Sequence, residues 1–168
     1  EELKKEFDYI LCDSPAGIER GATLAMYFAD TAIVVSNPEI SSVRDSDRML
    51  GILDSKSRRA ELGLESVKQY LLLTRYSLTR VEKGDMLSVD DVLDVLSIPL
   101  LSVVPESQAV LRASNAGVPV TLNGESDAHQ AYADAVSRLL GEEIPFKFTK
   151  VEKKSLLRRL FGREEIAT

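Results

Sequence analysis

The sequence has one cysteine, one histidine and no long apolar run, and each scarcity removes a class of protein. A single cysteine, Cys12, cannot form an intramolecular disulfide, so we expect a reducing compartment. Cys12 and His129 do not form a cluster with zinc-site spacing, and His129 lies in a polar stretch typical of a surface residue. No run reaches the roughly 18 apolar residues of a transmembrane helix, and residues 1–4 do not read as a signal peptide.

The composition is that of one globular domain with an uneven charge. The 168 residues are 44% apolar and 29% charged, enough for a sizeable core. The net charge is −6, yet residues 150–163 contain six lysines and arginines against Glu152 alone. The remaining body is therefore strongly acidic, which argues against a broad nucleic-acid surface.

Apolar runs alternate with segments of helical periodicity along the chain. The predicted strands are residues 7–12, 31–36, 70–75 and 98–104. The predicted helices are residues 20–29, 42–60, 88–97, 107–116 and 127–140. Gly117 and Gly141 follow two of these helices where a terminating glycine is expected. The alternation predicts an α/β fold, a mostly parallel sheet with helices on both faces.

The first run, residues 7–12, ends at Asp13 and a Pro-Ala-Gly turn. We expect a strand buried on both faces, with Asp13 at its carboxyl end where ligands of such sheets bind. A carboxylate there can hold a metal-bound water, and Gly17 lets the backbone approach a phosphate. The alternative is that Asp13 only begins a turn.

The other predicted strands also end in polar residues, namely Ser36-Asn37-Pro38-Glu39, Thr74-Arg75-Tyr76 and Pro105-Glu106. Because the carboxyl ends of parallel strands lie at one edge of a sheet, we expect these loops to converge. Against this interpretation, loops are polar wherever they occur.

A buried strand ending in aspartate fits half of a P-loop nucleotidase site, in which the acid helps to hold Mg²⁺. The other half is a Gly-x-x-x-x-Gly-Lys loop or a lysine-rich variant, and none of the nine glycines lies in one. We expect this loop to lie outside the present residues. On that expectation, the isolated chain does not hydrolyse ATP.

Several blocks resemble the MinD family of division-site-selecting ATPases, within the deviant Walker A (ParA/MinD) superfamily. They are residues 13–19, 37–48, 71–76, 84–93, 105–115 and 153–162. The resemblance implies a P-loop NTPase-like fold, incomplete at the amino terminus and followed by an amphipathic helix. It also implies Mg²⁺-dependent ATP hydrolysis by the parent protein.

The resemblance also implies residue roles. Asp13 would act on Mg²⁺ through water and serve catalysis together with Asp45, which would receive a lysine at a nucleotide-dependent dimer interface. Nucleotide contacts would come from Pro15, Ala16, Gly17, Thr74, Arg75, Pro105 and Glu106, the first three as a γ-phosphate switch and the rest around adenine. An alternative for Asp45 is a capping-box acid three residues after Ser42.

The partners implied are a second copy when ATP is bound, the division inhibitor MinC, the activator MinE and anionic lipids. Asp47 and Gly51 are candidate contacts for MinC and MinE near the dimer interface. No nucleic acid is expected. The implied location is the bacterial cytoplasm and the inner face of the cell membrane.

Residues 153–168 have the pattern of a helix that lies in a membrane interface. Apolar Leu156, Leu157, Leu160 and Phe161 form one stripe, flanked by Lys153, Lys154, Arg158 and Arg159. One such short segment binds a membrane weakly, whereas two copies on a dimer bind more tightly because the second segment is held close to the membrane by the first. The alternative is a terminal helix docked on the core.

We therefore expect a partial ATPase domain over residues 1–141, a linker over 142–152 and a membrane-targeting tail over 153–168. Two other functions stay open: a ParA-like DNA-partitioning ATPase and a non-catalytic membrane-binding remnant. An incomplete sheet also predicts poor solubility.

Overall fold

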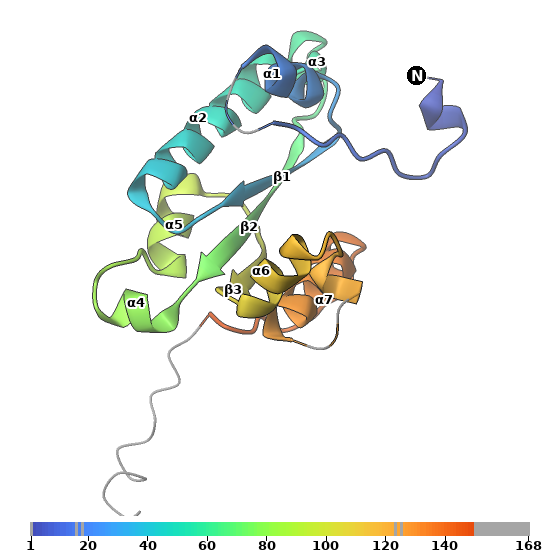
Figure 1. The fold of residues 1–168 in the computed structure, drawn as a ribbon. Helices are drawn as coiled ribbons and strands as arrows, with labels where there is room; N and C mark the ends of the chain where they lie inside the picture. The colour runs from blue at the N-terminus through green and yellow to red at the C-terminus, as the bar shows by residue number, and fades with distance from the viewer. Residues whose placement is uncertain (1, 16, 18, 123, 125, 150–168) are drawn as a thin grey trace, which may run out of the picture.

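The computed structural model describes residues 2–15, 17, 19–122, 124 and 126–149. Its sheet has three strands, β1 (Thr31–Ser36), β2 (Lys68–Tyr76) and β3 (Leu100–Pro105). The strands lie in the order β1-β2-β3, and both neighbouring pairs are parallel (Figure 1). The predicted α/β fold and three of the four predicted strands are confirmed.

Helices cover both faces of this sheet (Figure 1). The helices on one side are α1 (Arg20–Tyr27), α2 (Ile40–Lys56) and α5 (Val89–Leu96), with the short α3 (Arg58–Glu61) and α4 (Leu78–Glu82) at its ends. The other side carries α6 (Gln108–Asn115) and α7 (Asp127–Leu139). The described chain also has two 3₁₀ turns, η1 (Leu3–Lys5) and η2 (Val120–Leu122). Each predicted helix is present, with bounds shifted by a few residues.

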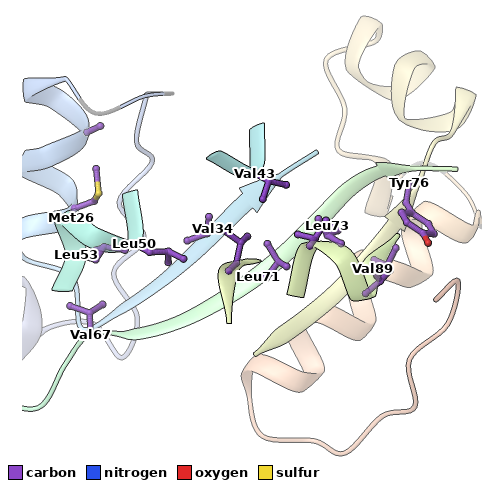
Figure 2. Close-up of a cluster of buried hydrophobic side chains, with 14 of the residues drawn as sticks. Met26, Val34, Val43, Leu50, Leu53, Val67, Leu71, Leu73, Tyr76 and Val89 are labelled. Atoms are coloured by element: carbon purple, nitrogen blue, oxygen red, sulfur yellow. The ribbon is translucent and has the colours of Figure 1, made fainter. Parts of the chain in front are cut away.

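The main core lies between the sheet and helices α1, α2 and α5 (Figure 2). Leu71 and Leu73 of the central strand point into it, and Leu72 between them belongs to the second cluster under α7. This alternation explains why the run Tyr-Leu-Leu-Leu is apolar throughout: β2 is covered on both faces.

Local capping explains where several helices begin and end. The Ser88 hydroxyl accepts from Asp91 N at 3.1 Å while the Asp91 carboxylate accepts from Ser88 N at 2.9 Å, a capping box that starts α5. Gly117 and Gly141 have φ of +67° and +95° directly after α6 and α7 terminate. Their predicted role as terminating glycines is confirmed.

The prediction of a buried strand at residues 7–12 is wrong for this structure. The segment lies outside the sheet, Leu11 is 90% exposed, and Cys12 is exposed as well. A strand requires a neighbour for its backbone hydrogen bonds, and the described sheet pairs residues 7–12 with none. Upstream of this segment, Lys4 forms an exposed 2.7 Å ion pair with Asp30.

Residues 142–149, within the expected linker, contain no helix or strand but pack against the body. Arg138 of α7 donates to Ile144 O, Pro145 O and Leu101 O at 3.0, 2.9 and 2.8 Å. Its guanidinium also lies 4.3 Å from the centre of the Phe146 ring. One arginine therefore ties this segment, which we call the strap, to both α7 and β3.

None of the helices in the described part of the chain is long and apolar enough to cross a membrane. The predicted amphipathic tail, residues 153–168, lies outside the described residues.

Candidate functional site

The carboxyl ends of the three strands meet at one edge of the sheet, as expected from the sequence. Thr74 Oγ1 at the end of β2 donates to Asn37 Oδ1 after β1 at 2.9 Å. Glu106 N after β3 donates to Tyr76 O of β2 at 2.9 Å. The sheet order thus places polar residues from all three strand ends along one continuous edge.

Arg75 and Glu106 offer opposite charges at this edge. Their closest N–O distance is 3.8 Å, and the side chains are 68% and 50% exposed. An exposed pair at that distance contributes little to stability, so both groups stay available to a ligand. Arg75 adopts φ +56°, an uncommon conformation for a residue with a side chain.

The residue after the exposed Arg75, Tyr76, is held in the core. Its side chain is only 4% exposed and packs in the main core (Figure 2). Burial raises the pKa of the Tyr76 phenol, which therefore stays neutral at physiological pH.

The loop after β1 is held by backbone contacts that the sequence did not indicate. Asn37 O accepts from Glu39 N at 2.8 Å, and the buried Pro38 accepts through its carbonyl from Leu87 N at 3.1 Å. Directly before this loop, Ser46 of α2 forms a buried 3.0 Å hydrogen bond with Ser36 of β1. These contacts attach α2 and the segment before α5 to the same strand end.

Asp45 lies in the second turn of α2 and is exposed. The helix begins at Ile40, so Ser42 is not its N-cap, and the capping-box alternative for Asp45 is wrong. The carboxylate is 3.6 Å from Arg48 Nη1, and its side chain is 70% exposed. A weak surface pair leaves this acid accessible to another molecule.

The predicted metal and phosphate residues do not assemble with this edge. Asp13 is exposed in the extended amino-terminal segment, and no hydrogen bond or ion pair joins it to another described residue. Pro15 packs beside Gly21 of α1, Gly17 has φ +94°, and Ala16 lies outside the described residues. The described residues contain no group of three or more acidic, histidine or cysteine side chains placed to hold a metal ion.

A separate apolar groove of about 840 Å³ lies between the sheet and helices α6 and α7. His129 lines it, half-buried, with a buried Nδ1 that has no hydrogen-bond partner among the described residues. The side chain of His129, expected at the surface, is thus only partly exposed and lines this groove.

A parallel sheet covered on both faces, with polar side chains gathered at its carboxyl edge, is the architecture of nucleotide-binding α/β proteins of the P-loop NTPase type. No family model matches the chain. It is, however, 63% identical over 161 residues to the septum site-determining protein MinD of Buchnera aphidicola, a match covering 96% of this chain. The chain belongs to the MinD family.

Solved structures give the same assignment. MinD in the MinC:MinD complex of Aquifex aeolicus superposes with a TM-score of 0.77 and 38% identity over 89% of this chain and 59% of that one. MinD of Pyrococcus horikoshii, complexed with Mg-ADP, gives 0.67 and 30% over 85% of this chain and 56% of that one. The chain spans 60% of the length of its Buchnera relative.

Proposed function

We propose that this chain is part of a MinD-type ATPase that helps to select the cell-division site. In this proposal the whole protein cycles between a cytosolic monomer and an ATP-bound dimer on the inner face of the membrane. The identity to MinD relatives across nearly the whole chain supports it most strongly. The relative from Pyrococcus horikoshii was solved with Mg-ADP, and the one from Aquifex aeolicus with MinC.

The sheet edge is our proposed site for the nucleotide base. Thr74 and Arg75 would line one side of it, and Pro105 and Glu106 the other. In support, Glu106 N is bonded to Tyr76 O, so the ends of β2 and β3 are held at a fixed spacing. The exposed guanidinium and carboxylate supply a donor and an acceptor for the rim of a heterocycle.

Asp45 is proposed to face a second copy of the protein. Its support is exposure together with the lack of a capping role in α2. MinC and MinE would dock on the same helix, near Asp47 and Gly51, both of which are exposed.

For Asp13, Pro15, Ala16 and Gly17 the roles on Mg²⁺ and the γ-phosphate stay predictions from the resemblance. We assign no step to them, because Asp13 forms no hydrogen bond or ion pair with another described residue and Ala16 lies outside the described residues. We likewise expect no ATP hydrolysis above background from the 168-residue chain.

Nucleotide binding can be tested by titrating the ¹⁵N-labelled chain with ADP and following backbone amide shifts. We expect shifts at residues 74–76 and 105–106, a reduced response in Arg75→Ala, and an unchanged response in the matched control Arg112→Ala on α6. The absence of any ADP-dependent shift at the strand ends would refute the proposed site.

Membrane binding by residues 153–168 is the second part of the proposal. Its support is the apolar stripe of Leu156, Leu157, Leu160 and Phe161 flanked by cations. Each cation near an anionic leaflet contributes about 1 kcal/mol, and partial burial of the stripe adds to it. Sedimentation with phosphatidylglycerol vesicles should capture the chain and release Leu157→Glu, whereas equal capture of both would favour a docked helix.

A further inference from the structure

The backbone of Asn37 is fixed more firmly than an exposed loop requires. It precedes Pro38, which restricts its conformation and is itself buried. Its carbonyl oxygen accepts from Glu39 N at 2.8 Å and from Ser36 Oγ at 3.2 Å. Leu87 N holds the next carbonyl, that of Pro38, at 3.1 Å. With the backbone of Asn37 fixed, only its side-chain amide can still change orientation.

That amide is oriented by its neighbour on the central strand. Thr74 Oγ1 donates to Asn37 Oδ1 at 2.9 Å, and both side chains are half-buried. The hydroxyl uses the carbonyl side of the amide, which leaves the NH₂ group with two donors. A fixed backbone with an oriented amide presents these donors in a defined direction at the sheet edge.

We propose that Asn37 is a base-specificity residue of the nucleotide site, donating from Nδ2 to the N1 or N7 acceptor of a purine base, and that Thr74 is its positioning residue. This inference rests on the proposed nucleotide site, to which it adds a contact from the β1 side. A purine presents unprotonated ring nitrogens at its edge, and an oriented NH₂ group matches such acceptors. A site of this kind discriminates against analogues that lack the acceptor, because the donor is then left unpaired.

The test pairs protein variants with base analogues. The full chain is titrated by NMR with ADP, 7-deaza-ADP and 1-deaza-ADP, each analogue replacing one ring nitrogen by carbon. We expect one of the two analogues to bind the unaltered chain about three- to tenfold more weakly than ADP, the cost of one hydrogen bond. In Asn37→Ala that difference should disappear, because the donor is gone.

Further variants separate binding from folding. Asn37→Asp keeps the acceptor for Thr74 but places an anion where the donor was, so it should weaken ADP binding more than Asn37→Ala does. Thr74→Val should weaken discrimination between ADP and the sensitive analogue, and Thr74→Ser, which retains the hydroxyl, should restore it. Asn115→Ala at the end of α6 is the matched control and should change neither measurement.

The outcomes distinguish this inference from the proposed function. If ADP binds with shifts at the strand ends but both deaza analogues bind equally well in every variant, the role of Asn37 is refuted and the site stands. If the unaltered chain does not bind ADP at the strand ends, both fail. Equal analogue sensitivity in Thr74→Val and Thr74→Ser would refute the positioning role of Thr74 alone.

Discussion

The buried carboxylate of Asp134 on α7 lies 3.2 Å from the ammonium nitrogen of Lys147 in the strap. Asp134 also accepts from Gln130 Nε2 at 2.6 Å, so the carboxylate has partners on its own helix and beyond it. Together with the contacts of Arg138, this pair holds the strap against the body as far as Lys147.

The pair predicts a dependence of stability on pH. Burial raises the pKa of Asp134, but hydrogen bonds from Gln130 and Lys147 and the nearby charges outweigh it, so the pKa lies below its ordinary value. The unfolded chain then takes up this proton more readily than the folded one. The stabilisation is present above the unfolded pKa of about 3.9 and is lost as the pH falls through the folded pKa.

Urea unfolding from pH 7 to pH 3 measures this contribution. Asp134→Asn should lower the free energy of unfolding at pH 7 by about 1–3 kcal/mol and flatten its decline below about pH 4. The control Asp94→Asn, at an exposed position on α5, should leave the decline of the free energy of unfolding below about pH 4 as steep as in the unaltered chain. If stability falls with pH as steeply in Asp134→Asn as in the unaltered chain, Asp134 is not the source of this pH dependence.

Arg138 of α7 should be the residue on which attachment of the strap depends most. Arg138→Ala removes three hydrogen bonds and the contact with Phe146, and it leaves Leu101 O without that donor. We expect a loss of about 2–4 kcal/mol in the free energy of unfolding, since hydrogen bonds from a charged donor are the stronger ones. Arg112→Ala should cost under about 0.5 kcal/mol as an exposed control. Equal losses in the two variants would show that the strap is not held by Arg138.

The buried hydroxyls of Ser36 and Ser46 should be energetically coupled. Both are 4% exposed, and each variant to alanine leaves the other hydroxyl with fewer partners. Each single change should cost about 1–2 kcal/mol, and the double variant clearly less than the sum. Chemical denaturation of the four proteins measures the coupling, and strictly additive losses would rule it out.

The outer edge of β1 should govern self-association. Within the described sheet β1 has one neighbour, and its Val35 side chain is 61% exposed. An apolar, unpaired edge promotes pairing with other chains, and a charge blocks it. Val35→Lys should therefore raise the fraction of monomer in sedimentation velocity. Leu111→Lys, at a 55% exposed position on α6, should not, and equal effects would implicate general surface hydrophobicity instead.

Periodicity alone predicted most of the fold. The strand at residues 31–36 has the predicted bounds, and β2 and β3 differ from prediction by one or two residues. The apolar side chains of these strands pack against the covering helices, and their backbones pair with parallel neighbours. Residues 7–12 have an equally strong pattern, yet the described sheet provides no partner for them.

Composition and periodicity therefore determined the α/β class of this protein, and sequence blocks spread along the chain indicated its family. Only the tertiary structure decided which polar residues meet. The contact between Asn37 and Thr74 joins positions 37 residues apart, and the one between Ser36 and Ser46 depends on how α2 crosses the sheet. A sequence pattern records which side of an element is apolar, but the strand order and helix packing determine which side chains lie within hydrogen-bonding distance.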